Sequence, residues 1–378
     1  CIFAKIRYLC TATKLHDRNT QKHPMYSENT TRLFFQLLRS GLKPAQTPAV
    51  AGEISMQAWE NIFRMATDQG VCAVIWDGIG RLSKELQPPR DMRLRWALTA
   101  EKQEKRYRRQ QEKAAKMAAV FAENGIRMLL LKGLGLSRDY PIPAHRECGD
   151  IDIYLFGASG EGDRLLQELG AHLYFDVPKH SEYTWESVQI ENHRTILNVR
   201  RNRTERELNA LLLRLLEKKG TTKIGENTEV PPATFNAIYL IRHAAVHYQK
   251  EGIAVRHLCD WACFMERHWQ EIDHPLFQKT MTDYRLDRFA ALMTAAAVRH
   301  LGAEIPEPQY DADTLERFMR EIYAMKPMPT RRLPKLYFKL FGPLHNRWRL
   351  RSVLRSSPWR YYYDTVRAQW NERFTLFR

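Results

Sequence analysis

The sequence predicts an α+β protein in which a small mixed β-sheet is flanked by an N-terminal and a C-terminal helical region. Apolar residues recur at helical spacing through residues 25–125 and again after residue 203. Between them, residues 126–202 carry short apolar runs of strand length separated by glycine turns. The chain has 378 residues, 44% of them hydrophobic, which suffices for a sizeable core and two or three domains.

Four helices are predicted before the sheet. Residues 1–24 show no clear period, and we expect them to be a non-native or disordered leader with Met25 as the natural start. Ser55 is suited to capping the N-terminus of the second helix. The predicted helices begin at Ser27, run from Ser55 to Met65, from Val71 to Leu86, and from Arg90 to Glu123.

The last of these helices contains a dense run of charge at residues 101–116, EKQEKRYRRQQEKAAK. Acidic and basic residues four apart in this run can pair along one helix face. We therefore favour a solvated helix face, and a patch that binds nucleic acid or lipid is the alternative.

The stretch from Met128 to Phe156 organises the sheet. It is predicted to form a strand, a turn at Lys132-Gly133, a short helix, a loop and a second strand. On that second strand Asp150 and Asp152 are two residues apart, so both side chains point to one face while isoleucines and a leucine point to the other. Two carboxylates held on an apolar backing suit the binding of Mg²⁺ against a nucleoside triphosphate.

Three residues near these aspartates are candidates for phosphate binding. Gly133 lets the backbone turn tightly and approach a ligand closely, and the helix that follows begins where an anion is favoured. Lys132 supplies a point charge, and Arg146, four residues before Asp150, supplies a fork of donors.

Further strands are predicted at His172–Phe175, Ser181–Trp185 and Ser187–Glu191, with an edge strand at Thr195–Val199. Alternation along the third of these places Glu191 on the face opposite to its apolar neighbours, so it can join the two aspartates. Beyond residue 203 the pattern is helical, apart from a loop predicted at Gly220–Pro232.

These motifs resemble those of the bacterial nucleotidyltransferase family of the DNA polymerase β superfold. The resemblance covers about residues 55–270 and is strongest at residues 128–156. Its elements share an order along the chain: Lys132-Gly133 after a strand, Tyr140-Pro141, Pro143, Arg146, Gly149 to Ile153, Ile190 to His193, the pair His243 and His247, and the group Arg256, Asp260 and Trp261.

The resemblance implies a nucleotidyltransferase core at 126–202, followed by a helical domain at 203–330. In such an enzyme Asp150 and Asp152 bridge two Mg²⁺ ions, and Glu191 binds the catalytic ion and helps to deprotonate an acceptor hydroxyl. The nucleoside triphosphate is held by Lys132, Gly133 and Arg146. A nucleoside monophosphate passes to the acceptor, and pyrophosphate leaves.

A cleft for the acceptor is expected among His193, His243, His247 and Arg256. The alternative is that the histidines are packed within the helical domain and that Arg256 pairs with Asp260 one turn along the helix. The sequence leaves the nucleotide and the acceptor open: a sugar phosphate, a protein hydroxyl, a small alcohol and an RNA end all remain.

Composition favours a cytoplasmic protein with anionic partners. The formal net charge is +16, and the six cysteines show no zinc-like spacing. No apolar run approaches the length of a transmembrane helix. Residues 331–378 mix twelve Lys and Arg with aromatic residues, a pattern that favours peripheral contact with an acidic membrane or with nucleic acid. The alternative for this tail is a helical cap packed on the body.

Two other functions remain open at this point. A catalytically degenerate module would bind nucleotide without transferring it, and an adaptor would act through its basic segments on membrane or nucleic acid. The presence of Glu191 as a third acid favours an enzyme over the degenerate module.

Overall fold

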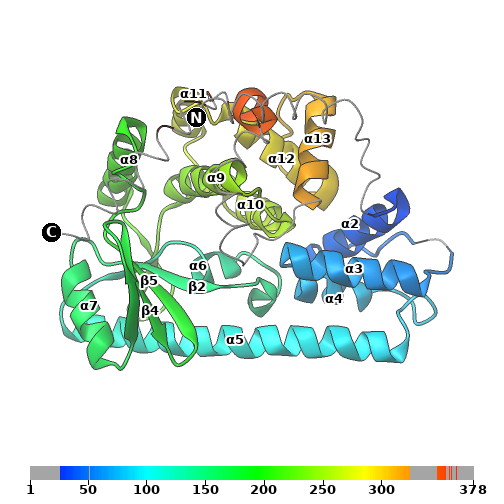
Figure 1. The fold of residues 1–378 in the computed structure, drawn as a ribbon, viewed down its shortest axis with the longest axis horizontal. Coiled ribbons are helices and arrows are strands. Elements are labelled where there is room, and N and C mark those ends of the chain that lie inside the picture. The colour runs from blue at the N-terminus through cyan, green and yellow to red at the C-terminus, as the bar shows by residue number, and fades with distance from the viewer. Residues whose placement is uncertain are drawn as a thin grey trace, which may run out of the picture.

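The computed structural model describes residues 26–50, 52–323 and 347–354, together with Ser357, Trp359 and Tyr363. The predicted leader at 1–24 and most of the basic tail lie outside this range. One mixed sheet of seven strands is flanked by helices, which confirms the predicted α+β class (Figure 1).

The strand order of the sheet is β3-β4-β5-β2-β1-β7-β6. β2 is antiparallel to β1 and parallel to β5, and this parallel pairing sets Asp152 directly opposite Glu191. The strands are β1 (Met128–Leu130), β2 (Asp150–Tyr154), β3 (His172–Asp176), β4 (His180–Trp185), β5 (Val188–His193), β6 (Thr222–Lys223) and β7 (Thr228–Val230).

Two predictions about the edges of the sheet are wrong. The predicted loop at Gly220–Pro232 contains the hairpin β6–β7, and β7 pairs with β1 in parallel. The predicted edge strand at Thr195–Val199 does not form. Its backbone is held by the following helix instead, because the side chain of Asn209 accepts a hydrogen bond from Leu197 N at 3.0 Å.

The predicted N-terminal helices form, with Ser55 as the N-cap of α3, although α4 ends well before Leu86. Ser27 and Ser55 accept hydrogen bonds from the first turns of α2 and α3. α2 and α4 cross so closely that a Cβ on Gly78 would lie 2.0 Å from Leu37 O. The four helices are α2 (Glu28–Leu42), α3 (Met56–Gln69), α4 (Cys72–Ile79) and α5 (Arg90–Glu123).

Helix α5 runs along one side of the whole molecule, from α4 to α7 (Ser159–Glu168) (Figure 1). Its charged run has a solvated face with the expected pairs, Glu101–Lys105 at 2.6 Å and Glu104–Arg108 at 3.5 Å. The opposite face supports the loop that leads into β2. Gln103 donates to Ala144 O at 3.1 Å, Arg106 pairs with Glu147 at 3.2 Å, and Gln110 donates to Gly149 O at 3.4 Å.

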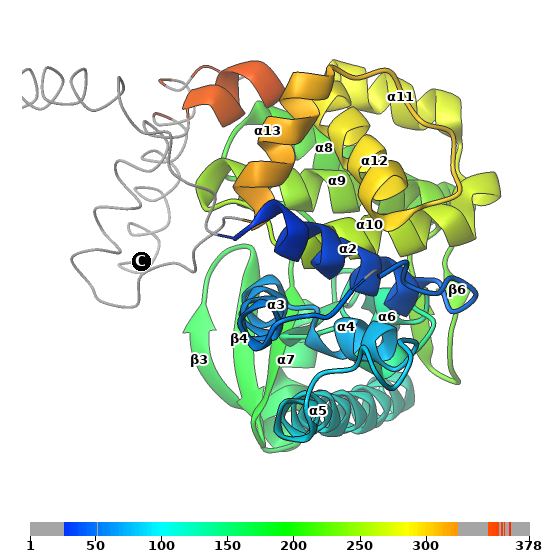
Figure 2. The ribbon, with the colours of Figure 1, turned by 90° about the vertical axis from the view of Figure 1, so that its right-hand side faces the viewer.

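A second group of helices covers the sheet from the side opposite α5, and α2 packs against α12 of that group (Figure 2). A short π-helical turn, η3 (Arg349–Val353), lies on this helical group with Leu350 and Val353 buried. No helix within the described residues is both long enough and apolar enough to cross a membrane. The helical group opposite α5 comprises α8 (Arg203–Lys219), α9 (Ala233–Lys250), α10 (Val255–His268), α11 (His274–Asp283), α12 (Asp287–Leu301) and α13 (Ala312–Tyr323).

Candidate active site

The structure brings the three predicted acids together on one face of the sheet. Asp150 and Asp152 come from β2 and Glu191 from β5, and one carboxylate oxygen from each lies within 4.8 Å of the others. Ile151 and Ile153 fill the opposite, buried face. The alternation of the two strands and their parallel register are sufficient to create this cluster.

The charges around the cluster are unequal. Lys132 Nζ lies 3.0 Å from Asp152 Oδ1, and His193 Nε2 donates to the same oxygen at 2.9 Å. Burial opposes the charge on Asp152, but Lys132 and His193 outweigh it and hold the pKa of this carboxyl well below its usual value. The charge of Asp152, followed by burial, raises the pKa of Asp150 to about 6.

These carboxylates fit a divalent cation. Asp152 Oδ2 is buried and has no hydrogen-bond partner among the described residues, an expensive state for a carboxylate oxygen. Burial raises the pKa of Glu191, but the hydrogen bond from His193 and the charge of Lys132 lower it overall. Three clustered carboxylates of which one oxygen is unpaired provide the hard oxygen donors that Mg²⁺ prefers.

Gly133 forms the sharp turn between β1 and the short helix α6 (Leu134–Ser137). Its φ of +54° is one that residues with a side chain rarely adopt. A Cβ at this position would lie 3.2 Å from Asp150 O and 3.5 Å from Cys148 Sγ. The glycine therefore lets the turn approach the strand that carries the aspartates.

Replacing this glycine should strain the site. We expect Gly133→Ala to destabilise the protein by about 1–3 kcal/mol, because the turn must hold an unfavourable φ beside a backbone oxygen. Gly149→Ala is the matched control, since Gly149 has an ordinary φ and no atom would lie within 4 Å of its new Cβ. Urea unfolding of the two variants measures the difference, and equal stabilities would contradict the strain.

Arg146 lines the same site but is already engaged within the protein. Its guanidinium is buried and forms a bidentate ion pair with Asp260, with Nε–Oδ1 at 2.8 Å and Nη2–Oδ2 at 2.9 Å. Nη1 donates to Glu147 O at 3.2 Å and to Cys148 Sγ at 3.0 Å. Asp260 therefore pairs with Arg146 and not, as the alternative had it, with Arg256. Because its three nitrogens already donate, Arg146 ties the loop before β2 to α10.

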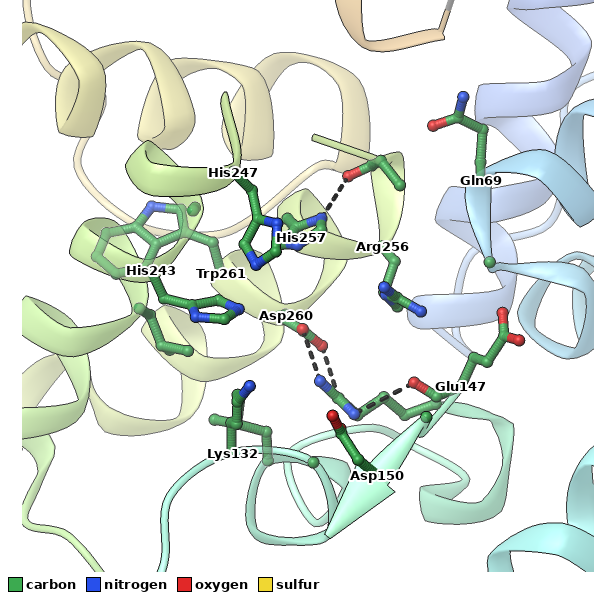
Figure 3. Close-up of a pocket in the computed structure, with 18 of the residues that line it drawn as sticks. Gln69, Lys132, Glu147, Asp150, His243, His247, Arg256, His257, Asp260 and Trp261 are labelled. Carbon is green, nitrogen blue, oxygen red and sulfur yellow. Dashed lines mark hydrogen bonds and ion pairs between the residues drawn. The ribbon is translucent and has the colours of Figure 1, made fainter. Parts of the chain in front are cut away.

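A cavity of about 600 Å³ opens over the acids, between the sheet, the end of α3 and helices α9 and α10 (Figure 3). Its floor, as we name it, carries Asp150, Glu191, Lys132 and Lys179. Its helical wall lies opposite and carries His243 and His247 from α9 and Arg256 and His257 from α10.

The histidines form a cluster on the helical wall. The ring centroids of His243 and His247 are 4.6 Å apart, and His257 stacks on His243 at 6.3 Å. Burial, followed by the charge of Lys132, lowers the pKa of His243 well below its usual value. Burial and the neighbouring Arg256 lower the pKa of His257 to about 3. Both imidazoles are therefore neutral near pH 7.

His193 does not lie with the other acceptor-cleft candidates. It is 1% exposed, does not line the cavity, and contacts Asp152 and Glu191 from behind. Its observed contacts are those of a residue that orients the two carboxylates.

Sequence reasoning missed Lys179 and His257. Lys179 lies in the turn between β3 and β4, and among the described residues its ammonium has no ion pair and no hydrogen bond. Pairing β4 with β5 would have found it, because His180 lies opposite His193 and so brings Lys179 beside the strand that carries Glu191. No comparable signal marks His257, whose place depends on how α10 packs.

One of three comparisons with known proteins gives a match. A model of the family described as an uncharacterised nucleotidyltransferase matches residues 55–302, and the chain belongs to that family. The matched range spans α3 to α5, the whole sheet and α8 to α12. No curated protein and no solved structure matches the chain.

Proposed function

We propose that the protein transfers a nucleoside monophosphate from an NTP to an acceptor hydroxyl, on a fold of the DNA polymerase β type. The observation that carries the proposal is the cluster of Asp150, Asp152 and Glu191, with an unpaired buried oxygen on Asp152. A module that only binds nucleotide has no need of the third acid, and here Glu191 lies opposite Asp152 in the sheet register.

In this proposal the three clustered acids would hold two Mg²⁺ ions. When bound, the ions act as Lewis acids on phosphate oxygens and stabilise the charge that develops during transfer. The carboxylates of Asp150, Asp152 and Glu191 would hold the ions. The protein itself keeps these carboxylates ionised and oriented through Lys132 and His193.

The remaining residues bind and orient the substrates. Lys132 and Lys179 supply positive charge to the triphosphate, Gly133 lets the backbone approach it, and Arg146 fixes the loop before β2. The acceptor oxygen forms a bond to the α-phosphorus while the bond from that phosphorus to the bridging oxygen breaks. Pyrophosphate leaves with that oxygen, and the hydroxyl proton passes to Glu191.

The direct test is calorimetric titration of ATP, CTP, GTP and UTP into the protein, with Mg²⁺ and with EDTA. We expect one or more nucleotides to bind only when Mg²⁺ is present. A folded protein that binds none of the four would overturn the proposal and leave the binding surfaces of an adaptor as the better explanation.

Lys179→Met should weaken Mg²⁺·NTP binding by about 10–100-fold, the loss expected when a charged hydrogen bond to phosphate is removed. The folded stability of Lys179→Met should not fall below that of the wild type. The Lys179 ammonium has no partner among the described residues, and burial and the charge of Lys132 already lower its pKa. Lys102→Met, exposed on α5, is the control. Equal nucleotide affinity in the two variants would remove Lys179 from the site.

A further inference from the structure

The helical wall of the cavity carries a cation without a counter-ion. Arg256 lines the cavity from the first turn of α10 and points into it (Figure 3), yet within the described parts of the chain its side chain makes no ion pair and no hydrogen bond. Two acids near it, Asp260 and Glu147, are already engaged with other arginines. Asp260, one helical turn away, pairs with Arg146 through both oxygens, and Glu147 pairs with Arg106 at 3.2 Å.

A purely structural role does not explain this arginine. A positive charge in the first turn of a helix opposes the helix dipole, and α10 has no acidic residue in that turn to compensate. The side chain lies close to the end of α3, because a Cβ on Gly70, the glycine that ends this helix, would lie 3.4 Å from Arg256 Nη1 and 2.8 Å from Glu147 Oε2. The guanidinium therefore lies between the end of α3 and the start of α10, facing the cavity.

The groups beside Arg256 are suited to hydroxyls and not to further anions. His257 Nδ1 donates to Ala254 O at 3.2 Å, which leaves the lone pair of Nε2 as an acceptor. Burial keeps His257 and His243 neutral, so this wall offers one positive charge together with imidazole acceptors. Lys179, which also has no partner among the described residues, is in electrostatic reach of Asp150, Asp152 and Glu191.

Lys179 lies beside the acids, whereas Arg256 lies on the helical wall. From this separation of the two cations we infer that the acceptor is a hydroxylated molecule that carries an oxyanion group, phosphate or carboxylate, and that Arg256 binds this group. The inference rests on the proposed nucleotidyl transfer and names the chemical class of its second substrate. The floor takes the Mg²⁺ ions and the triphosphate, and the fork of the guanidinium takes the oxyanion of the acceptor. The acceptor hydroxyl then points from the helical wall toward Glu191.

Inorganic phosphate is the probe for this site. Its binding is measured by calorimetry in the presence of Mg²⁺ and a saturating ATP analogue with a methylene group between the α- and β-phosphorus atoms. We expect phosphate to bind beside the analogue. We expect Arg256→Gln to weaken phosphate at least ~10-fold without changing the affinity for the analogue, and Arg256→Lys to weaken it less. Arg203→Gln, on the exposed surface of α8, is the matched control.

Several results would overturn the inference. Displacement of phosphate by the analogue, or a weaker affinity of Arg256→Gln for the analogue, would assign Arg256 to the triphosphate. Unchanged phosphate binding in Arg256→Gln, or none in the wild type, would exclude an oxyanion site at this wall. If the analogue itself does not bind, the proposed function fails and the inference fails with it. Repeating the titration with acetate distinguishes a carboxylate-bearing acceptor, which acetate mimics, from one that carries phosphate.

Discussion

Asp150→Asn should lose more than ~100-fold of nucleotidyl transfer and yet unfold at a higher denaturant concentration than the wild type when no metal is present. The loss follows from the proposed role as a metal ligand, since even residues that only support such ligands cost about 10–100-fold when they are replaced. The gain follows from charge, because ionised Asp150 faces ionised Asp152 across a buried site.

The gain in stability of Asp150→Asn should depend on pH. A carboxyl whose pKa rises from 3.8 to about 6 on folding destabilises the folded state once it is ionised, by up to about 3 kcal/mol. The cost is absent below about pH 4, builds up between pH 4 and pH 6, and is complete at pH 7. The advantage of Asp150→Asn over the wild type should therefore disappear as the pH falls toward 4.

Urea unfolding in EDTA across this pH range, and the rise of the melting temperature with added Mg²⁺, measure the two effects separately. Asp283→Asn, which changes an exposed carboxylate on α11, is the control. A variant that keeps Mg²⁺-dependent nucleotide binding would exclude Asp150 as a metal ligand. A variant less stable than the wild type in EDTA would contradict the repulsion between the two aspartates.

Local patterns in the sequence were sufficient for the acids of the site. Strand alternation gives the common face of Asp150 and Asp152, and it gives Glu191 the right parity. The turn at Gly133 could be predicted because the chain must turn sharply between the end of a strand and the start of a helix, and glycine permits such a turn. These features depend on neighbours in the chain or on one strand pairing, so periodicity could reveal them.

Long-range packing decided the features that were not predicted. The partner of Arg146 lies 114 residues away on α10, and helix geometry alone would have paired Asp260 with Arg256. The hairpin β6–β7 reaches the sheet from within the helical half, where two short strands leave little periodicity to detect. The cavity is likewise formed by three segments far apart in sequence, so its lining could only be seen in three dimensions.

Asp260→Ala should be the most destabilising of the substitutions considered, by about 3–5 kcal/mol. Asp260 is buried and accepts from Arg146 at 2.8 and 2.9 Å and from Tyr140 Oη at 2.8 Å. Its removal leaves a buried guanidinium without a counter-ion, and such losses cost several kcal/mol. Urea unfolding at pH 7 measures the change, and a loss below about 1 kcal/mol would show that the ion pair is not a strong link between the loop and α10.

The double variant Arg146→Met/Asp260→Leu then separates a positioning role of Arg146 from a role in phosphate binding. Replacing both members of a buried pair by apolar side chains removes the unpaired charge, so most of the stability lost in Asp260→Ala should return. If Arg146 only fixes the loop before β2, Mg²⁺·NTP should bind to this stable double variant with an affinity within about 10-fold of the wild type, less than the loss expected of Lys179→Met. A larger loss in the folded double variant would show that the guanidinium leaves Asp260 to bind the triphosphate, as the sequence motif around Arg146 first indicated.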